Sequence, residues 1–231
     1  MSPREADISG SFTMVHNASH KRYTTGFMAL KTKIALGLRD ERAEVGDHIA
    51  YFWENDREFC EAVRFLETGL DGNDFCVIFG HDEGNTRVRK TLQKNGYNLD
   101  RLEADERLVT LGGHSDADQM LASIGTVFAR AVTRGATLIR LLGNIGWGHE
   151  GWPAEKAILE FEARVTAAAK LFPSVVVCMY DVAALPGRVV LHGAFETHPI
   201  TFAGNVMREN PHYVEMEEFL KRLNGRNPPS E

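Results

Sequence analysis

Seven side chains suited to holding a small organic molecule fall at or just beyond the ends of apolar runs that are typical of β-strands. Aromatic rings supply apolar walls, an amide and an imidazole supply orienting hydrogen bonds, and a carboxylate stands at the edge. This mixture favours an apolar or aromatic ligand over a phosphorylated one. The seven candidates are Tyr51, Trp53, Glu54, Asn144, Trp147, Tyr180 and His198.

Each candidate also has a purely structural interpretation. Tyr51 and Trp53 can pack in a core, with Glu54 as a solvated acid at the start of a helix. The glycine-rich segment 143–149 can be a plain turn, since glycine permits backbone conformations that other residues avoid. His198 is held extended by the proline that follows it, and a histidine in such a place is more often structural than a ligand contact. Residue types alone leave these alternatives open.

The sequence predicts no catalytic residue, no metal ligand and no cofactor. Asp181 is better explained as a cap for the segment that follows it than as a reactive acid. His16 and His20 are four residues apart but lie in a segment of poor helix propensity without a third ligand nearby. The sequence contains no nucleophile elbow, zinc-protease motif or Cys-x-x-Cys pair. The three cysteines are distant from one another and are expected to be small buried apolar residues: Cys60, Cys76 and Cys178.

Strand-like and helix-like segments alternate from residue 46 onward. This alternation predicts an α/β fold of three layers, with a mostly parallel sheet covered by helices on both faces. Ligands of such sheets bind at the carboxyl ends of the strands, which is the rule that selects the candidates above. The expected strands are 48–53, 75–79, 108–111, 138–142, 175–180 and 199–202. The expected helices cover about 56–70, 86–95, 117–134, 153–168, 186–195 and 214–223.

The turn after the first strand lacks a phosphate-binding loop. A nucleoside triphosphatase of this layout needs a glycine-rich turn that ends in Gly-Lys-Ser/Thr between the first strand and its helix. Here the turn runs from Trp53 to Asp56, has neither glycine nor lysine, and carries two carboxylates. Because carboxylates repel phosphate, the fold is expected to bind something other than ATP.

Composition indicates one globular domain with an N-terminal extension. The chain has 231 residues, of which 43% are hydrophobic and 25% charged. Residues 1–45 form a polar lead and a possible helix over 26–42, residues 46–224 form the domain, and residues 225–231 form a tail. The helix over 26–42 could pack on the domain or on a partner chain, including a second copy of the protein.

Charge and hydropathy limit the partners. The net charge is −6; residues 1–45 carry +2, because they hold seven Lys or Arg and five Asp or Glu, which leaves −8 on the remainder. An acidic domain is poorly suited to binding nucleic acid directly. No apolar stretch approaches the ~20 residues of a membrane span, and residues 1–10 lack the apolar region of a signal peptide. We therefore expect a cytoplasmic protein without direct nucleic-acid or membrane contacts.

Seven short motifs follow one another between roughly residues 46 and 223. They are Gly46-Asp47-His48-Ile49-Ala50-Tyr51-Phe52, Phe65-Leu66-Glu67-Thr68-Gly69-Leu70, Leu141-Leu142-Gly143-Asn144-Ile145-Gly146-Trp147, Glu160-Phe161-Glu162, Cys178-Met179-Tyr180-Asp181, His198-Pro199 and Glu209-Asn210-Pro211-His212-Tyr213. In this order and spacing they resemble the MEDS domain, a sensory domain of methanogens and methylotrophs that occurs in bacterial repressors and signalling proteins.

This resemblance implies a degenerate relative of the RecA/KaiC ATPases that has lost the phosphate loop. It also implies a non-catalytic sensor that binds a small organic molecule, such as a hydrocarbon derivative, and signals to a regulatory protein partner. Unlike the repressors of the family, this sequence has no recognisable DNA-binding motif ahead of the domain. Two alternatives remain: a protein-interaction module with a vestigial pocket, and a nucleotide binder without hydrolysis.

Overall fold

A computed structural model describes residues 33–225. Seven strands form one sheet in the order β5-β4-β6-β7-β3-β8-β9, and every neighbouring pair is parallel except β8 with β9. A separate antiparallel pair precedes the sheet: β1 (Lys33–Ala35) and β2 (Arg42–Glu44). The seven strands are β3 (His48–Trp53), β4 (Phe75–Gly80), β5 (Leu108–Gly112), β6 (Ile139–Asn144), β7 (Ser174–Asp181), β8 (Ile200–Ala203) and β9 (Val206–Glu209).

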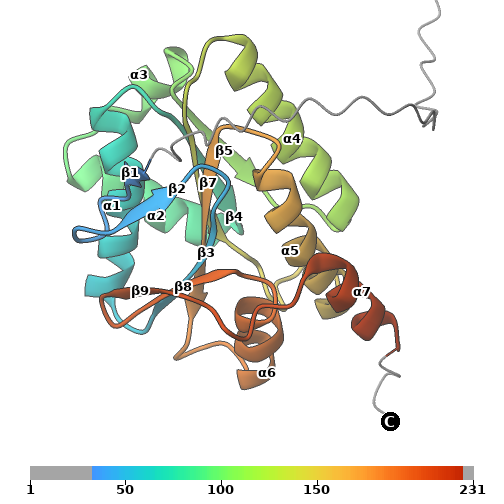
Figure 1. The fold of residues 1–231 in the computed structure, drawn as a ribbon. Helices are drawn as coiled ribbons and strands as arrows, with labels where there is room; N and C mark the ends of the chain where they lie inside the picture. Colours follow the sequence, from blue (N-terminus) through green and yellow to red (C-terminus); the bar gives the residue numbers. More distant parts are fainter. Residues whose placement is uncertain (1–32, 226–231) are drawn as a thin grey trace, which may run out of the picture. The chain divides into compact units, whose positions relative to one another are not determined.

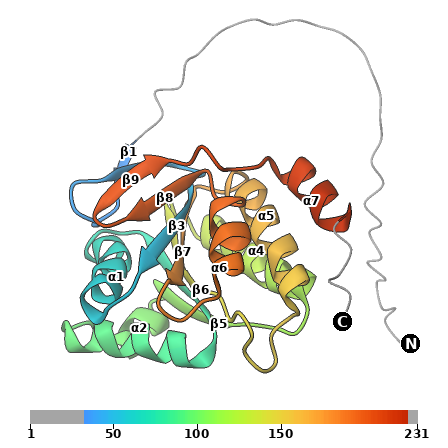
Figure 2. The same ribbon diagram turned by 90° about the horizontal axis from the view of Figure 1, so that it is seen from below.

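Helices cover both faces of this sheet, which confirms the predicted three-layer α/β architecture (Figure 1). One face packs on α1 and α2, and the opposite face packs on α4 and α5, with α7 against α5 (Figure 2). The helices are α1 (Asp56–Asp71), α2 (Asp82–Lys94), α3 (Leu99–Ala104), α4 (Ala117–Thr133), α5 (Glu155–Ala169), α6 (Gly187–Val189), the π-helix η1 (Val190–Phe195) and α7 (Met216–Gly225).

The two faces of the central strand β3 separate two apolar cores. Because side chains alternate across a strand, Ile49 and Tyr51 enter the core under α1, whereas His48 and Ala50 face α5 on the other side. Neighbouring β7 carries Cys178 opposite Ala50. The face of the strand on which a side chain of β3 or β7 lies therefore decides which core it enters and which residues it contacts.

The predicted strands and most predicted helices are present, but the helix over 26–42 is wrong where it can be checked. Residues 33–35 and 42–44 are paired strands, and residues 26–32 lie outside the described part of the chain. The buried Arg140 side chain holds this hairpin, donating to the Ala35 carbonyl at 2.9 Å while its Nε binds the Asp74 carboxylate at 2.7 Å. The apolar spacing that suggested a helix includes Ile34 and Leu38, which here pack against the α1 core.

Among residues 33–225 no helix is long and apolar enough to cross a bilayer.

Candidate functional site

A pocket of about 130 Å³ lies over the carboxyl ends of β3, β4, β6 and β7. Three of the seven sequence candidates meet there: Trp53, Asn144 and Trp147. The walls are completed by His81, Ile145, His149, Met179, Asp181, Ala184 and Leu185. The position is the one that the topology of a parallel sheet favours for ligands.

The register of the sheet brings these strand ends together. Trp53, the last residue of β3, pairs with Asp181 at the end of β7. Asn144, the last residue of β6, pairs with Gly80 at the end of β4. At Gly80 (φ +159°) an added Cβ would lie 2.4 Å from the Asn144 carbonyl oxygen. Glycine therefore allows the close approach that carries His81 to the pocket rim.

Two buried N–H donors at this pocket have no hydrogen-bond partner within the described residues: Asn144 Nδ2 and Trp147 Nε1. A buried polar group without a partner costs about 1–3 kcal/mol. Both residues line the pocket, and because each nitrogen is itself closed to solvent, a shift of the side chain would bring the donor to an acceptor on a ligand. The pocket can thus hold a small molecule with an apolar body and at least one oxygen or other acceptor.

Two histidines stack at the rim of the pocket. The rings of His81 and His149 have centroids 4.0 Å apart at an interplanar angle of 32°. Burial lowers the pKa of His81 below its usual value, and the proximity of His149 lowers it further. The neutral His81 ring accepts the Gly84 N–H at Nδ1 over 3.3 Å and so caps the start of α2.

Asp181 is an internal cap rather than a free acid. Its Oδ1 accepts the backbone N–H groups of Ala183 and Ala184 at 3.0 and 3.2 Å. This arrangement matches the capping role expected from sequence. The carboxylate shapes the turn that forms one wall of the pocket.

Glu54 lies outside this pocket and lines a shallower neighbouring one of about 320 Å³, which it shares with Trp53. Two backbone N–H groups near the start of α1, those of Glu54 and Glu58, bind side chains of the protein itself. Asn55 Oδ1 accepts the Glu58 N–H at 3.1 Å, and the Glu58 carboxylate accepts the Glu54 N–H at 2.9 Å. The Glu58 carboxylate therefore lies beside the N-terminus of α1, where acidic side chains are favourable.

The other three sequence candidates lie away from the pocket, in the interior. Tyr51 is 1% exposed, stacks on Phe202 with centroids 5.0 Å apart, and donates its hydroxyl to the Glu58 carbonyl at 2.9 Å. Tyr180 is fully buried on the opposite face, because the register pairs Tyr51 with Met179 and so puts Tyr180 out of phase. His198 precedes β8 and so sits at the amino end of that strand, not its carboxyl end.

His198 belongs instead to a buried polar cluster made by four separate segments. The cluster comprises His48 at the start of β3, Glu162 on α5, Cys178 on β7 and His198 before β8; one donor atom from each lies within 4.8 Å of all the others. His48 Nε2 is 3.3 Å from Cys178 Sγ and 3.6 Å from Glu162 Oε2. His198 Nε2 is 3.7 Å from the same oxygen. These residue types can hold a metal ion.

Burial favours the neutral forms of this cluster. Desolvation raises the pKa of Glu162 to about 8, although the Tyr180 hydroxyl that reaches Oε1 at 3.0 Å opposes the shift. Desolvation also lowers the pKa of His198 to about 3 and holds the pKa of His48 well below its usual value. It raises the pKa of the Cys178 thiol well above the ordinary range. His198 Nε2 nevertheless has no hydrogen-bond partner among the described residues.

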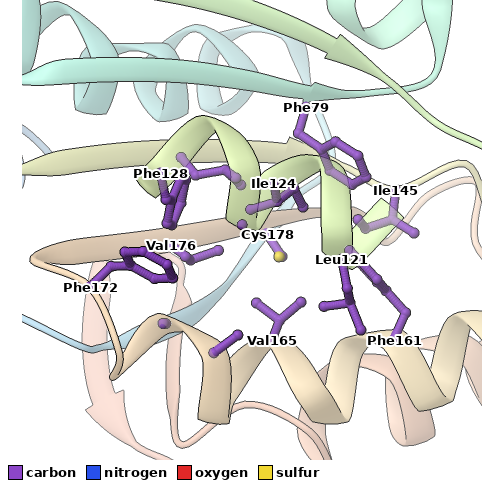
Figure 3. A pocket seen from close by; sticks show the side chains of 14 residues that line it. Phe79, Leu121, Ile124, Phe128, Ile145, Phe161, Val165, Phe172, Val176 and Cys178 are labelled. Atoms are coloured by element: carbon purple, nitrogen blue, oxygen red, sulfur yellow. The ribbon is translucent and has the colours of Figure 1, made fainter. Parts of the chain in front are cut away.

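A small apolar cavity of about 40 Å³ adjoins this cluster (Figure 3). It lies between α4, α5 and the sheet, and Phe79, Phe128 and Phe161 are among its walls. Cys178 is shared by the cavity and the cluster, and its sulfur points into the space between the two helices. The cavity offers almost no polar atoms, so only a very small apolar molecule suits it.

His81, Glu162 and His48 were not predicted from the sequence as site residues. His81 directly follows β4 and could have been found by the same strand-end rule that selected Trp53. Glu162 interrupts the apolar stripe of α5 between Ile158 and Val165, and a charged residue on a buried stripe is a signal of a polar contact. No comparable signal links His48 to Cys178, because their contact depends on the sheet register.

Comparison with known proteins gives two matches. The family model described as "MEDS: MEthanogen/methylotroph, DcmR Sensory domain" matches residues 47–199. The transcriptional repressor DcmR of Methylorubrum extorquens is 23% identical over 142 residues, which make up 61% of this chain. The match spans 53% of that repressor, about half of its length.

Proposed function

The chain belongs to the MEDS family of sensory domains, and from this premise we propose that it is a non-catalytic sensor that binds a small organic ligand and signals to a partner regulator. The family match and the similarity to a repressor support the sensory and regulatory role. The observation that carries the ligand-binding part is the pocket at the carboxyl ends of β3, β4, β6 and β7, with its two unpartnered donors.

Pocket size and chemistry specify the ligand class. The volume of about 130 Å³ is close to the ~150 Å³ that accommodate benzene in an engineered apolar cavity. Trp53, Ile145, Met179 and Leu185 supply apolar walls. The donors of Asn144 and Trp147 require an acceptor. We therefore expect a molecule of about benzene size or smaller that carries a carbonyl, hydroxyl or similar acceptor.

A route from ligand to partner starts at Trp147. A Cβ added at Gly193 would lie 2.8 Å from the Trp147 indole, so this ring packs directly on η1. The half-turn that contains Ala184 and Leu185 forms another wall and leads into α6. A ligand that shifts Trp147 or this turn would move the surface formed by α6 and η1, which we propose as the surface presented to a regulator.

Two features oppose the alternatives. The pocket lining contains no Ser, Thr, Cys or Lys, and its single carboxylate, Asp181, is engaged in capping the turn that follows. The turn before α1 has neither glycine nor lysine and carries the carboxylates of Glu54 and Asp56, which repel a nucleotide phosphate. Both features favour a sensor over an enzyme or a nucleotide binder.

Native mass spectrometry of freshly purified protein, followed by a thermal-shift screen of small alcohols, ketones and aromatic compounds, tests the proposal. We expect a co-purified or added small molecule to bind with one-to-one stoichiometry. Trp147→Phe should abolish the shift, since it removes the indole donor and keeps the ring. Trp152→Phe is the matched control, because Trp152 packs against Gly113 and Gly146 and does not line this pocket. Equal loss of binding in both variants would reject the pocket.

A further inference from the structure

We propose that His48, Glu162, Cys178 and His198 form a buried tetrahedral binding site for a divalent transition-metal ion of the zinc type. This site is distinct from the ligand pocket, and the inference does not depend on the sensory role. It concerns a feature that the sequence did not reveal, since sequence motifs predicted no metal ligand.

The spacing of the donor atoms fits a four-coordinate ion. Metal–nitrogen and metal–oxygen bonds of ~2.0–2.1 Å and a metal–sulfur bond of ~2.3 Å put tetrahedral ligand atoms roughly 3.3–3.6 Å apart. The measured separations from His48 Nε2 are 3.3 Å to Cys178 Sγ and 3.6 Å to Glu162 Oε2. From Glu162 Oε2, Cys178 Sγ and His198 Nε2 are each 3.7 Å away. The separations of His198 Nε2 from His48 Nε2 and Cys178 Sγ are at most 4.8 Å, so an inward shift of the His198 ring would complete the coordination.

In both histidines the hydrogen is on Nδ1, so the lone pair of Nε2 is available to a metal ion. His198 Nδ1 lies 3.0 Å from the Ala194 carbonyl, which can only accept, so Nδ1 carries the hydrogen. The Thr166 hydroxyl donates to the Thr197 carbonyl at 2.9 Å, and it therefore accepts from His48 Nδ1 at 2.8 Å. Both Nε2 lone pairs point into the cluster, in the arrangement by which outer hydrogen bonds orient metal-binding imidazoles.

One nitrogen of the cluster, His198 Nε2, has a lone pair that no group among residues 33–225 uses. His198 is fully buried, and its Nε2 has no hydrogen-bond partner in the described part of the chain. Buried imidazole nitrogens normally have one. A metal ion would use this lone pair, as well as the lone pair of His48 Nε2.

Charge balance selects a divalent ion. Binding requires the Cys178 thiol to lose its proton and Glu162 to be ionised, and both protons leave to solvent. The thiolate, the carboxylate and two neutral imidazoles carry −2, so a +2 ion makes the site neutral. Neutrality is important because all four side chains are almost completely buried, Cys178 at 2% exposure being the most accessible. Two imidazoles with one thiolate favour a zinc-type ion over calcium or magnesium, which prefer oxygen ligands.

Cobalt(II) is the probe for the site, because tetrahedral Co²⁺ absorbs in the visible range and a Co²⁺–thiolate bond adds a charge-transfer band in the near ultraviolet. The full chain is unfolded under reducing conditions with a chelator, refolded without metal, and titrated with Co²⁺ and then with Zn²⁺. A second sample is refolded with Co²⁺ present, so that slow entry into the buried site does not hide binding. We expect one Co²⁺ per chain, both absorption features, and displacement by one equivalent of Zn²⁺.

Variants locate the site. Cys178→Ser should remove the charge-transfer band, and His198→Gln should weaken Co²⁺ binding more than a hundredfold. Thr166→Val removes a partner of a ligand rather than a ligand and should weaken binding by roughly 10–100-fold. Cys76→Ser is the matched control: Cys76 is equally buried on β4 and lies in the other core, so the spectrum should be unchanged.

The wild-type titration alone can overturn the proposal, whatever the variants do. A folded wild-type chain, verified by circular dichroism, that shows no tetrahedral Co²⁺ spectrum after refolding with the ion would refute it. So would equal loss of the charge-transfer band in Cys76→Ser and Cys178→Ser, since the thiolate would then be elsewhere.

Discussion

Replacing Trp147 by phenylalanine tests whether its indole N–H is unpartnered in the free protein. Trp147 is 8% exposed, and its Nε1 has no hydrogen-bond partner among residues 33–225. Truncation leaves unfilled space: tryptophan exceeds phenylalanine by roughly 40 Å³, and a cavity of that size costs about 1 kcal/mol. Removal of a buried donor without a partner returns about 1–3 kcal/mol. These two effects together leave the variant between equally stable and about 2 kcal/mol more stable than the wild type.

Urea denaturation followed by circular dichroism measures this difference. Trp147→Ala sets the scale, because loss of the whole ring from a buried site costs about 3–5 kcal/mol. Trp152→Phe provides a comparison, because the indole of Trp152 is half-buried and can reach solvent. This substitution therefore removes no buried donor that lacks a partner. Destabilisation of Trp147→Phe by more than about 2 kcal/mol would mean that Nε1 has a partner in the free protein, and the argument for an acceptor-bearing ligand would fail.

Three further predictions follow from the same structure. Isothermal calorimetry and phosphate-release assays should detect neither tight Mg-ATP binding nor hydrolysis, because the turn before α1 has neither glycine nor lysine and carries the carboxylates of Glu54 and Asp56; micromolar affinity would contradict this. Gel-shift assays of this chain alone with the upstream region of its own operon should show no specific complex at moderate salt, because the net charge is −6. The third concerns His81. Burial lowers the pKa of its ring from the ordinary value of 6.5, so the neutral ring contributes fully to stability above pH 6.5. This contribution is lost as the pH falls through the lower pKa of the folded state. His81→Asn keeps a capping acceptor without this titration, so the unfolding free energy of the variant should improve relative to wild type as the pH falls below 6.5. If the difference between variant and wild type does not change with pH, His81 does not contribute to acid sensitivity.

The sheet was predictable because its strands are continuous apolar runs between turn signals, and a parallel sheet buries both faces. The run at 175–180 and the one at 75–79 are examples, and both are fully buried. The short edge strand β9 was missed because its sequence, with Arg208 and Glu209, has no apolar run. The hairpin of β1 and β2 falls within and just beyond the helix predicted over 26–42. That prediction failed because, over so few residues, the spacing of apolar residues does not distinguish a packed hairpin from an amphipathic helix.

The candidate pocket was predictable in part, since the strand-end rule brought Trp53, Asn144 and Trp147 together. The rule fixes how far along a strand a residue lies but not which face it occupies. Tyr51 and Tyr180 are at comparable heights on adjacent strands and yet point into opposite cores, because the register is offset by one residue. A one-residue difference in register reverses every side chain, and register is a property of the folded sheet.

The position of β3 in the sheet has a consequence for synthesis. This strand is the first of the sheet to leave the ribosome, yet its neighbours are β7 and β8, which begin at Ser174 and Ile200. Well over a hundred residues must therefore emerge before β3 finds either partner, whereas β4 and β5 can pair as soon as both are made. Contacts between such distant segments form slowly, because a long loop must close before they stabilise the chain. Until then the apolar run 48–53 lacks its strand partners, and unpaired apolar strands of this kind are where folding intermediates aggregate.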